Sequence, residues 1–501
     1  MIYVNIQSNR FRKQIEYVFN TIFFILGVPI EYVENTNRQN ATGQDILIGY
    51  VDDLENTFDN FSLYDHIIVI RNSGRLFGDG YLKVSSIPDS VKHISLAETH
   101  KAGSAVSIFH RDPQPYIRKE LNGSKKYIIT NMDMISDVFF MITRYEEVIN
   151  AMISEKDEFK RFPAKKSLAC NNNFLNRPIV NEHIELLWSW IDSFQLGYER
   201  KNWWKSRDFA VCLTHDVDCV QKNKNLYDVG KHMIAALLKL GNIKKAFTYA
   251  LNSIKNLSDY SKDPYWIFDY IMGFEKQFGF NSSFYFMSLP VSDPDNRYDI
   301  RDIKIKKLIY EIESQGFEAG YHGSLNSYND LESMEKEKER LDGVVLKKPY
   351  GCRQHYLMFK PPFTWRYQKK AGILYDTTLS FAEHEGFRCG ICFPYKPYDI
   401  IDDTILDIWE IPLLIMEVTL QAPEYRSLSP EAGLKNIIGI IETVKRYKGV
   451  FTLLWHNSSF DYNWNGWKCV FEETIRYLCG SNCLALSGRE IVEYIRLHSY
   501  A

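Results

Sequence analysis

Residues 209–218 read Phe209-Ala-Val-Cys-Leu-Thr-His-Asp-Val-Asp218, and this stretch decides the fold of the chain. Its first five residues are apolar, as is typical of a strand that is buried on both faces of a parallel sheet. The stretch ends in Asp216 and Asp218, two positions apart, so both carboxylates leave the strand on the same side. Burying them is costly without a cation, a metal ion or water. The carboxyl ends of parallel strands hold the chemistry of α/β enzymes, so we interpret this end as a candidate site, with a simple strand cap as the alternative.

The chain around this stretch is long enough for two or three domains, with 501 residues of which 45% are hydrophobic. Residues 1–200 predict a separate α/β domain, in which we find no acid cluster, phosphate-binding loop or nucleophile motif. Residues 205–501 alternate strands with helices in about seven units, which predicts a barrel-like or open parallel α/β fold. Further strands are expected near Phe280–Ser288, Glu318–His322, Gly351–Leu357, Ile373–Leu379, Leu406–Met416 and Gly449–His456.

Composition narrows the class of protein. The net charge of −3 gives no reason to expect a nucleic-acid partner. Nine cysteines are scattered along the chain without the two CxxC pairs of a zinc ribbon, which argues against a zinc ribbon or a disulfide framework and favours a reducing compartment. The N-terminus lacks a basic region and a cleavage pattern, so it does not resemble a signal peptide. We therefore expect a cytoplasmic protein.

A basic segment follows the acidic strand. Residues 221–262 hold eight lysines against Asp228 and Asp259, and their apolar residues recur near helical spacing. This predicts a helical insertion in the second domain. A basic amphipathic helix suits peripheral contact with an anionic membrane or attraction of an anionic substrate, and the alternative is a helix with an ordinary solvated face.

Polar residues recur at the ends of the predicted strands. Parallel strands bring their carboxyl ends to one edge of the sheet, so these residues are expected to meet. They are Asp216, Asp218, His322, Arg353, His355, Asp376 and His456.

Five short motifs occur in order along the second domain: Thr214-His-Asp-Val-Asp218, His322-Gly-Ser-Leu-Asn326, Arg353-Gln-His355, Tyr375-Asp-Thr-Thr378 and Leu454-Trp-His456. This succession resembles the polysaccharide deacetylases, the NodB-homology enzymes of carbohydrate esterase family 4. The resemblance covers about residues 205–495, and the first domain is similar to an extra domain of a bacterial subgroup. It implies a distorted (β/α) barrel in residues 205–501. It also implies a metal-dependent hydrolase that removes N-acetyl or O-acetyl groups from a saccharide, with a role in surface-polysaccharide biosynthesis.

The resemblance also implies a role for each matching residue. Asp216 matches the catalytic base, and Asp218 and His322 match ligands of a divalent metal, most typically zinc. Arg353 matches the arginine that orients the base. His456 matches the histidine that protonates the leaving group.

Two positions depart from the family pattern. The second metal histidine of the family falls on Asn326, whose amide oxygen is a weaker ligand for zinc than an imidazole. Either Asn326 or water completes the site, or His355, His384 or His215 replaces it, or metal binding is lost. The proline of the family's arginine motif is absent as well.

The remaining candidates are assigned to substrate binding: His355, Asp376 and Trp455. Two alternatives to a deacetylase stay open. One is a catalytically inactive saccharide-binding protein on the same fold, which the replacement at Asn326 suggests. The other is a glycoside hydrolase with paired carboxylates, for which Glu383, Glu385 and Glu410 are available.

Overall fold

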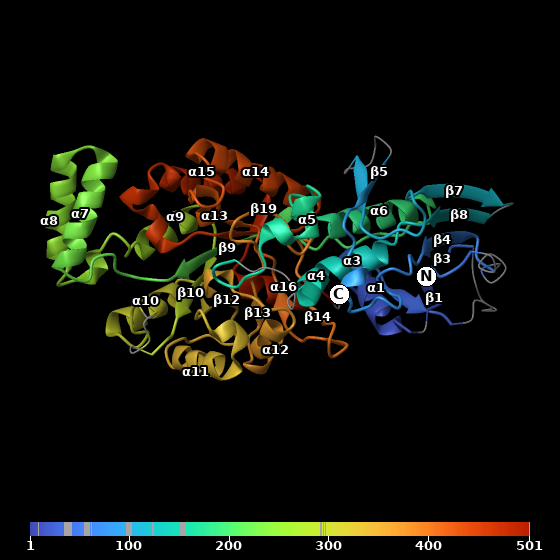
Figure 1. The fold of residues 1–501 in the computed structure, drawn as a ribbon, viewed down its shortest axis with the longest axis horizontal. Coiled ribbons are helices and arrows are strands. Elements are labelled where there is room, and N and C mark those ends of the chain that lie inside the picture. Colours follow the sequence, from blue (N-terminus) through green and yellow to red (C-terminus); the bar gives the residue numbers. More distant parts are fainter. Residues whose placement is uncertain are drawn as a thin grey trace. The chain divides into compact units, whose positions relative to one another are not determined.

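The structure, a computed structural model, describes residues 1–8, 10–34, 43–54, 61, 63–96, 103–122, 125–150, 157–290, 293, 295 and 297–499. The chain divides into two compact units. One unit comprises Met1–Trp203, Phe387–Asp407 and Arg496–Ala501, and the other comprises Trp204–Gly386 and Ile408–Ile495. Both units combine helices with a largely parallel sheet (Figure 1).

The first unit is built on a six-stranded sheet of order β2-β1-β3-β4-β8-β7. All neighbours are parallel except β7 and β8, which pair antiparallel. The strands are β1 Ile2–Ile6, β2 Ile30–Tyr32, β3 Ile46–Val51, β4 His66–Arg71, β7 Ile117–Asn122 and β8 Lys125–Thr130, with a separate hairpin of β5 Lys92–Ser95 and β6 Ser104–Ser107. The helices of this unit are α1 Arg12–Leu26, α3 Met134–Ile142, α4 Tyr145–Asn150, α5 Leu168–Asn171 and α6 Ile179–Ser193.

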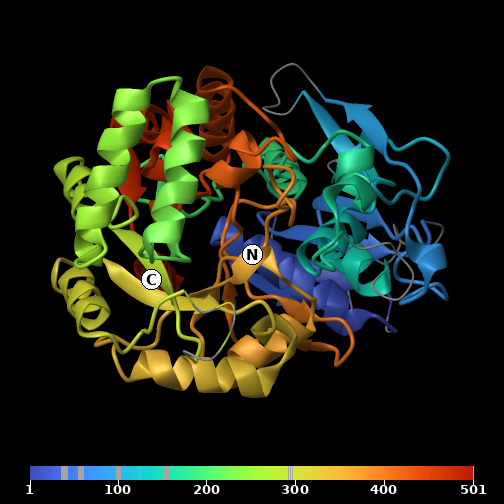
Figure 2. The same cartoon turned by 60° about the vertical axis from the view of Figure 1, so that its left-hand side comes forward.

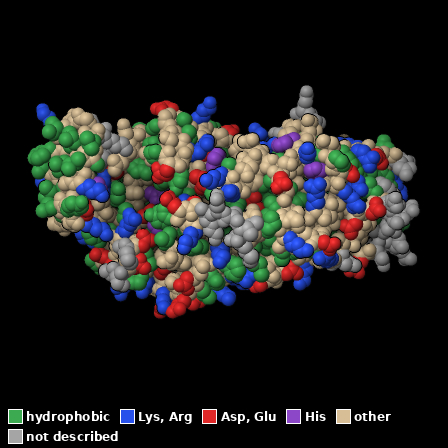
Figure 3. Space-filling view, viewed as in Figure 1, with side chains coloured by type: hydrophobic (Ala, Val, Ile, Leu, Met, Phe, Trp, Pro, Cys, Tyr) green, Lys and Arg blue, Asp and Glu red, His purple; other side chains and the backbone are tan. Residues whose placement is uncertain are grey.

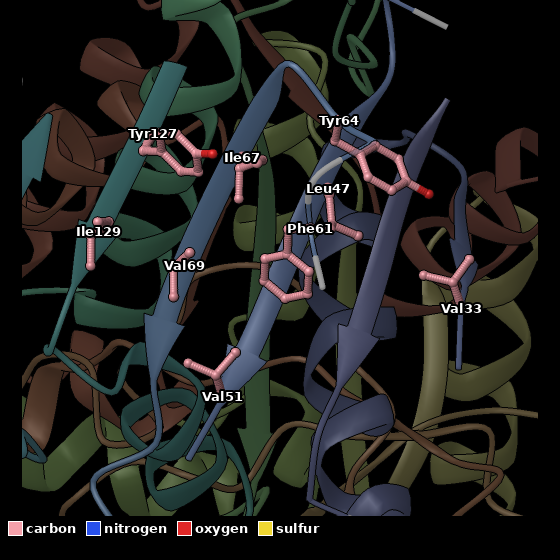
Figure 4. Packing of buried hydrophobic residues seen from close by; sticks show 9 residues of the cluster. All are labelled: Val33, Leu47, Val51, Phe61, Tyr64, Ile67, Val69, Tyr127 and Ile129. Carbon is pink, nitrogen blue, oxygen red and sulfur yellow. The ribbon is translucent and has the colours of Figure 1, made fainter. Parts of the chain in front are cut away.

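One face of this sheet carries a buried apolar cluster (Figure 4). Alternate residues of a strand point to the same face, so Ile67 and Val69 of β4 both belong to the cluster. Phe61 covers Gly49 of β3, where a side-chain Cβ would lie 2.5 Å from the Phe61 ring. The glycine therefore makes room for an aromatic ring in this core.

The segment 387–407 joins the first unit through buried polar contacts. Arg388 pairs with Glu147 at 2.7 Å, and Arg144 contacts the same carboxylate at 2.8 Å. Asn181 accepts a hydrogen bond from the backbone N–H of Cys392. Leaving any of these charged groups buried and unpaired would be strongly destabilising, so the contacts hold a late part of the chain within the first unit. This segment contains the short pair β14 Tyr398–Asp399 and β15 Thr404–Ile405.

The second unit is built on a parallel sheet of order β16-β13-β12-β11-β10-β9-β18-β17, with β19 paired to β9. The strands are β9 Phe209–Val217, β10 Ser282–Met287, β11 Glu318–Gly323, β12 Cys352–Gln354, β13 Tyr375–Asp376, β16 Trp409–Glu410, β17 Ile415–Met416, β18 Val450–Leu454 and β19 Cys483–Ala485. Every strand pair along this order is parallel. The predicted barrel-like parallel α/β fold is confirmed.

The helices of this unit pack around the sheet, except α7 Leu226–Leu240 and α8 Ile243–Asn256, which stand away from it as a pair (Figures 1 and 2). The others are α9 Phe268–Gln277, α10 Ile303–Ser314, α11 Leu331–Asp342, α12 Phe363–Lys370, α13 Glu417–Gln421, α14 Pro430–Arg446, α15 Trp467–Cys479 and α16 Gly488–Ser499. Ser429 caps α14 through a hydrogen bond from the N–H of Ala432. Ser487 and Glu490 form the capping box of α16, in which each residue's backbone N–H bonds the other's side chain.

Some predicted strands are shorter in the structure. The expected strand Gly351–Leu357 gives way after Gln354 to the 3-10 turn η5 His355–Leu357. The expected strand Leu406–Met416 is divided into β16 and β17. Among the helices that the structure describes, none combines the length and the apolar character needed to cross a membrane.

Candidate metal and catalytic site

The register of the sheet brings the polar strand ends together. Asp216 of β9 pairs with Tyr285 of β10, and Met287, two residues further along β10, pairs with His322 of β11. His322 in turn pairs with Arg353 of β12. These side chains therefore meet at the carboxyl ends of neighbouring strands, although more than a hundred residues separate the first from the last.

Three side chains at this edge can hold a metal ion: Asp218, His322 and His355. The Nε2 atom of His322 lies 3.0 Å from Oδ1 of Asp218 and 3.1 Å from Nδ1 of His355. The Nδ1 atom of His355 lies 3.3 Å from the same carboxylate oxygen. Ligand atoms around a tetrahedral zinc ion stand about 3.3–3.6 Å apart, so these three atoms need to separate by only ~0.3 Å.

The tautomer of His322 is fixed by its other nitrogen. Nδ1 lies 2.9 Å from the carbonyl oxygen of Arg353, and a carbonyl can only accept, so Nδ1 carries the proton. In the neutral imidazole, Nε2 then presents a lone pair to Asp218 and His355. A proton on Nε2 satisfies one of these contacts, whereas a cation between the three atoms satisfies all of them. Backing of a ligand histidine by a backbone carbonyl is also the usual outer arrangement of metal sites.

His355 has a similar outer contact. Its Nε2 atom faces Oδ2 of Asp295 at 4.0 Å, and neither atom has a hydrogen-bond partner among the described residues. A proton on Nε2 leaves the lone pair of Nδ1 directed at Asp218 and His322. The donor set of one carboxylate and two imidazoles matches that of catalytic zinc sites, in which a fourth position stays open.

The charges of the group are strongly coupled. Burial on its own would raise the pKa of Asp218, but His355, His322 and His456 hold it well below its usual range. Burial on its own would lower the pKa of His322, and the carboxylates of Asp216 and Asp218 raise it above its ordinary value. The site therefore favours ionised carboxylates facing positive charge.

Asp216 is held beside the group by Arg353. The Nε atom of Arg353 lies 3.9 Å from Oδ1 of Asp216, and both side chains are buried. Arg353 donates from Nη2 to Oγ1 of Thr214 at 2.8 Å and lies over the ring of Tyr285. Thr214 itself donates to the carbonyl of Leu453 in β18. The guanidinium is thus fixed by two neighbouring strands, and Oδ1 of Asp216 has no hydrogen-bond partner in the described part of the chain.

His456 completes the group from the end of β18. Its Nε2 atom lies 3.7 Å from Oδ2 of Asp218, and its Nδ1 atom lies 2.8 Å from Oε1 of Glu417. The same oxygen accepts from the backbone N–H of His456 at 2.9 Å and from Oγ of Ser459 at 2.5 Å. Burial lowers the pKa of His456, but Glu417, Asp218 and Asp216 together raise it to about 10. His456 is therefore protonated at neutral pH.

Solvent reaches the group on one side. The side chain of Asp218 is 24% exposed and that of His456 is 12% exposed, whereas those of His322 and Arg353 are buried. An apolar cluster lies close to the group in sequence: Leu357, Ala382, Leu413, Met416 and Leu454. Its members flank His355, Glu417 and His456 along the chain, so the functional side chains extend from a packed apolar base.

Three predicted site residues lie outside this arrangement. Asn326 is exposed and precedes the 3-10 turn Ser327–Asn329, and His355 stands with Asp218 and His322 instead. Asp376 is buried among Gln368, Thr378 and Cys352, whose side chains all donate to it.

Trp455 is fully buried among aromatic rings, including those of Phe471 and Phe460, so its ring presents no surface to a substrate. The two other histidines considered as ligands have different partners. His215 contacts the carbonyl of Trp455 and the carboxylate of Glu275, and His384 contacts the backbone of Glu385.

Glu417 is the main residue that the sequence reasoning missed. It follows the apolar run that ends at Met416, which is the same signal that marked Asp216 and His456. The carboxylates considered for a glycoside hydrolase are arranged differently. Glu410 is buried and accepts from Nε1 of Trp365, and Glu385 pairs with Arg426 and Asn436.

Residues 3–195 match a family described as "Family of unknown function (DUF7033)". No curated protein matches the chain. Several solved structures are similar at low identity. A Mycobacterium smegmatis protein assigned to the polysaccharide deacetylases has 17% identity and a TM-score of 0.39, over 58% of this chain and 91% of its own.

Two further structures show the same level of similarity. The PuuE allantoinase has 12% identity and a TM-score of 0.38, over 59% of this chain and 93% of its own. Agd3, described as a novel carbohydrate deacetylase, has 8% identity and a TM-score of 0.36, over 100% of this chain and 87% of its own.

Proposed function

We propose that the second unit is a metal-dependent hydrolase that removes acetyl groups from a saccharide. The observation that carries the proposal is the group of Asp218 Oδ1, His322 Nε2 and His355 Nδ1, which lie 3.0, 3.1 and 3.3 Å from one another. When bound, a divalent ion supplies Lewis-acid chemistry: it polarises an acyl oxygen and makes a water more acidic.

The side chains around this group have the properties that amide hydrolysis requires. Asp216 carries an unpartnered oxygen 3.9 Å from the Arg353 guanidinium, so its carboxylate is placed to accept a proton from an attacking water. The water oxygen then forms a bond to the acyl carbon.

His456 provides the second proton transfer. Its imidazolium, supported by Glu417, can donate a proton from Nε2 to the departing amine while the carbon–nitrogen bond breaks. Acetate and a free amine are the products. Asp216 and His456 thus act as base and acid, and each transfer is worth ~10²–10⁴ in rate.

The finer assignments extend this proposal. We assign zinc as the metal because one carboxylate and two imidazoles suit it. We assign an N-acetylated saccharide as the substrate, within the NodB-homology class, on the ordered motifs from Thr214 to His456.

The test is acetate release by the full chain. Protein stripped with a chelator and reloaded with Zn²⁺ is incubated with a panel of N-acetylated and O-acetylated saccharides, and free acetate is quantified. We expect release from the reloaded protein alone. Asp216→Asn and His456→Gln should each reduce the rate ~10²–10⁴-fold while metal content stays the same.

Two results would contradict the proposal. Acetate release that survives unchanged in Asp216→Asn would remove the assigned base. Saccharide binding without any acetate release, in protein with stoichiometric zinc, would instead place the chain among saccharide-binding proteins.

A further inference from the structure

Helices α7 and α8 form a pair within the insertion that follows Asp218. They contact each other and lie side by side in Figures 1 and 2. Small residues occupy their buried faces: Ala236 in α7, and Ala246, Ala250 and Ser253 in α8. Because small side chains occupy these buried faces, most of the larger apolar residues of both helices lie outside the contact between them.

Several of the larger apolar residues are exposed and form a stripe along one side of each helix. In α8, Ile243, Phe247, Leu251 and Ile254 recur at helical spacing, and all four are exposed, Ile243 by 70%. Residues four, eight and eleven positions apart fall on one face of an α-helix. The buried Ala246 and Ala250 lie on the adjacent face, so this apolar stripe is not part of the packing between the helices.

The same pattern holds for α7. Tyr227, Ile234 and Leu238 are seven and four positions apart and are exposed, Leu238 by 82%. The buried Val229 and Ala236 lie on the opposite side of the helix. In Figure 3, hydrophobic side chains gather over the end of the molecule where α7 and α8 lie. Exposed apolar patches of this kind mark interaction sites in proteins.

Lysines border the apolar stripes. Three exposed lysines do so. In α8, Lys244 and Lys255 each directly follow a residue of the stripe, and in α7 Lys231 lies between Tyr227 and Ile234. Residues 226–256 contain five lysines, and Asp228 is their only acidic residue. An apolar stripe bordered by lysines complements a surface whose interior is apolar and whose outer layer is negatively charged.

The pair is rooted beside the candidate site. Asn457, the residue after His456, donates from Nδ2 to the carbonyl of Cys219 at 2.9 Å and to that of Tyr265 at 2.7 Å. These carbonyls lie at the two ends of the insertion. Lys222 also forms an ion pair with Asp461. The two helices therefore emerge from the carboxyl ends of the strands, where the candidate site lies.

We propose that α7 and α8 dock the protein onto the anionic phospholipid surface of a membrane. Each helix, with 15 or 14 residues, spans only ~22 Å, so it suits the plane of the interface. The apolar stripes enter the boundary between headgroups and acyl chains, and the lysines contact lipid phosphates. This docking rests on the helix surfaces alone and does not depend on the proposed hydrolase activity.

The test is sedimentation of the full chain with vesicles of equal parts phosphatidylserine and phosphatidylcholine, against vesicles of phosphatidylcholine alone. We expect binding to the anionic vesicles. The double variant Phe247→Gln, Leu251→Gln should weaken it at least about tenfold, because two apolar side chains no longer insert. Lys244→Gln and Lys255→Gln should each weaken it about fivefold at low salt, and less at high salt.

Ile303→Gln is the matched control. Ile303 opens α10, outside the insertion, and is 77% exposed, so its replacement should leave vesicle binding unchanged. Glutamine favours helices, and circular dichroism of every variant verifies that the fold is retained. Equal loss of binding in Ile303→Gln would overturn the proposal. The proposal would also be overturned if the native protein never bound vesicles and instead formed a dimer in sedimentation velocity. In that case the double variant Phe247→Gln, Leu251→Gln would dissociate the dimer.

Discussion

The carboxylate of Glu417 controls the charge of His456. It contacts both the side chain and the backbone of this histidine, and together with Asp218 and Asp216 it opposes burial, which lowers the pKa of His456. In Glu417→Gln we expect the pKa of His456 to fall from about 10 towards its ordinary value, because burial is then opposed only by Asp218 and Asp216. The protonated fraction above neutral pH then falls, so the alkaline limb of the pH–rate profile moves to lower pH. An NMR titration of His456 measures the same shift.

Ser459→Ala is the matched control for this change. Ser459 donates to the same oxygen of Glu417 at 2.5 Å, but its removal keeps the negative charge. We expect the alkaline limb of Ser459→Ala to stay close to that of the native protein. An unmoved limb in Glu417→Gln would mean that His456 is not the acid.

His355 distinguishes the metal site of the structure, in which it joins Asp218 and His322, from the site that the family pattern predicts, in which Asn326 takes this position. His355→Ala removes one of three facing ligand atoms, so we expect zinc affinity to fall by more than the 10–100-fold typical of an outer-contact change. Asn326→Ala and His384→Ala remove candidates that lie outside the group, and their affinities should match the native value. Competition with a chromophoric chelator gives all four constants. Weaker binding in Asn326→Ala than in His355→Ala would reverse the assignment.

The sequence predicted most of this site and missed specific parts of it. Asp216, Asp218, His322 and His456 were identifiable because each follows an apolar strand. The place of His355 depends on Tyr356 and Leu357, which adopt φ angles of 54° and 55° directly after β12. Positive φ is unfavourable for such residues, and no local pattern predicts it.

At the scale of single elements, β12 is positioned by close packing. A Cβ at Gly351, just before β12, would lie 2.0 Å from the ring of Tyr375. That ring cannot move easily, because its hydroxyl is 2.8 Å from the hydroxyl of Tyr285 and donates to Glu318 at 2.8 Å. Glycine is therefore required at position 351, because any larger residue would overlap the ring of Tyr375.

Gly351→Ala should therefore lower the free energy of unfolding by about 1–3 kcal/mol through overpacking. Gly439→Ala is the counterpart, since Gly439 lies inside α14 with open space at its Cβ position, and alanine there should stabilise the protein by about 0.5–1 kcal/mol. Denaturant unfolding monitored by circular dichroism gives both values. Equal effects of the two substitutions would show that the contact at Gly351 is unimportant.

The elements also show where sequence patterns lose information. Helix α10, Ile303–Ser314, has apolar residues at helical spacing, and strand β4, His66–Arg71, contains a continuous apolar run, so both can be located from the sequence. The apolar run Leu406–Met416 contains two short strands, because pairing partners on different strands, and not local sequence, decide where a ladder begins. No local pattern indicates that residues 387–407 join the first unit, since the contacts of Arg388 come from residues far away in sequence.

For the whole molecule, metal binding should be linked to stability. An ion that binds only the folded second unit adds about 2.7 kcal/mol at a free concentration 100 times its dissociation constant. We expect chelator to lower the melting temperature of native protein and to leave that of His355→Ala nearly unchanged. Calorimetry with and without added Zn²⁺ measures both. Equal sensitivity of the two proteins to chelator would place the stabilising ion elsewhere.

The central claim is that residues from three strand ends form one metal-binding group. Anomalous diffraction at the zinc absorption edge, from crystals of zinc-loaded protein, tests it most directly. We predict a peak with Asp218 Oδ1, His322 Nε2 and His355 Nδ1 each about 2.0–2.2 Å away. A peak coordinated by other side chains, with Asp218, His322 and His355 left without an ion, would contradict the account.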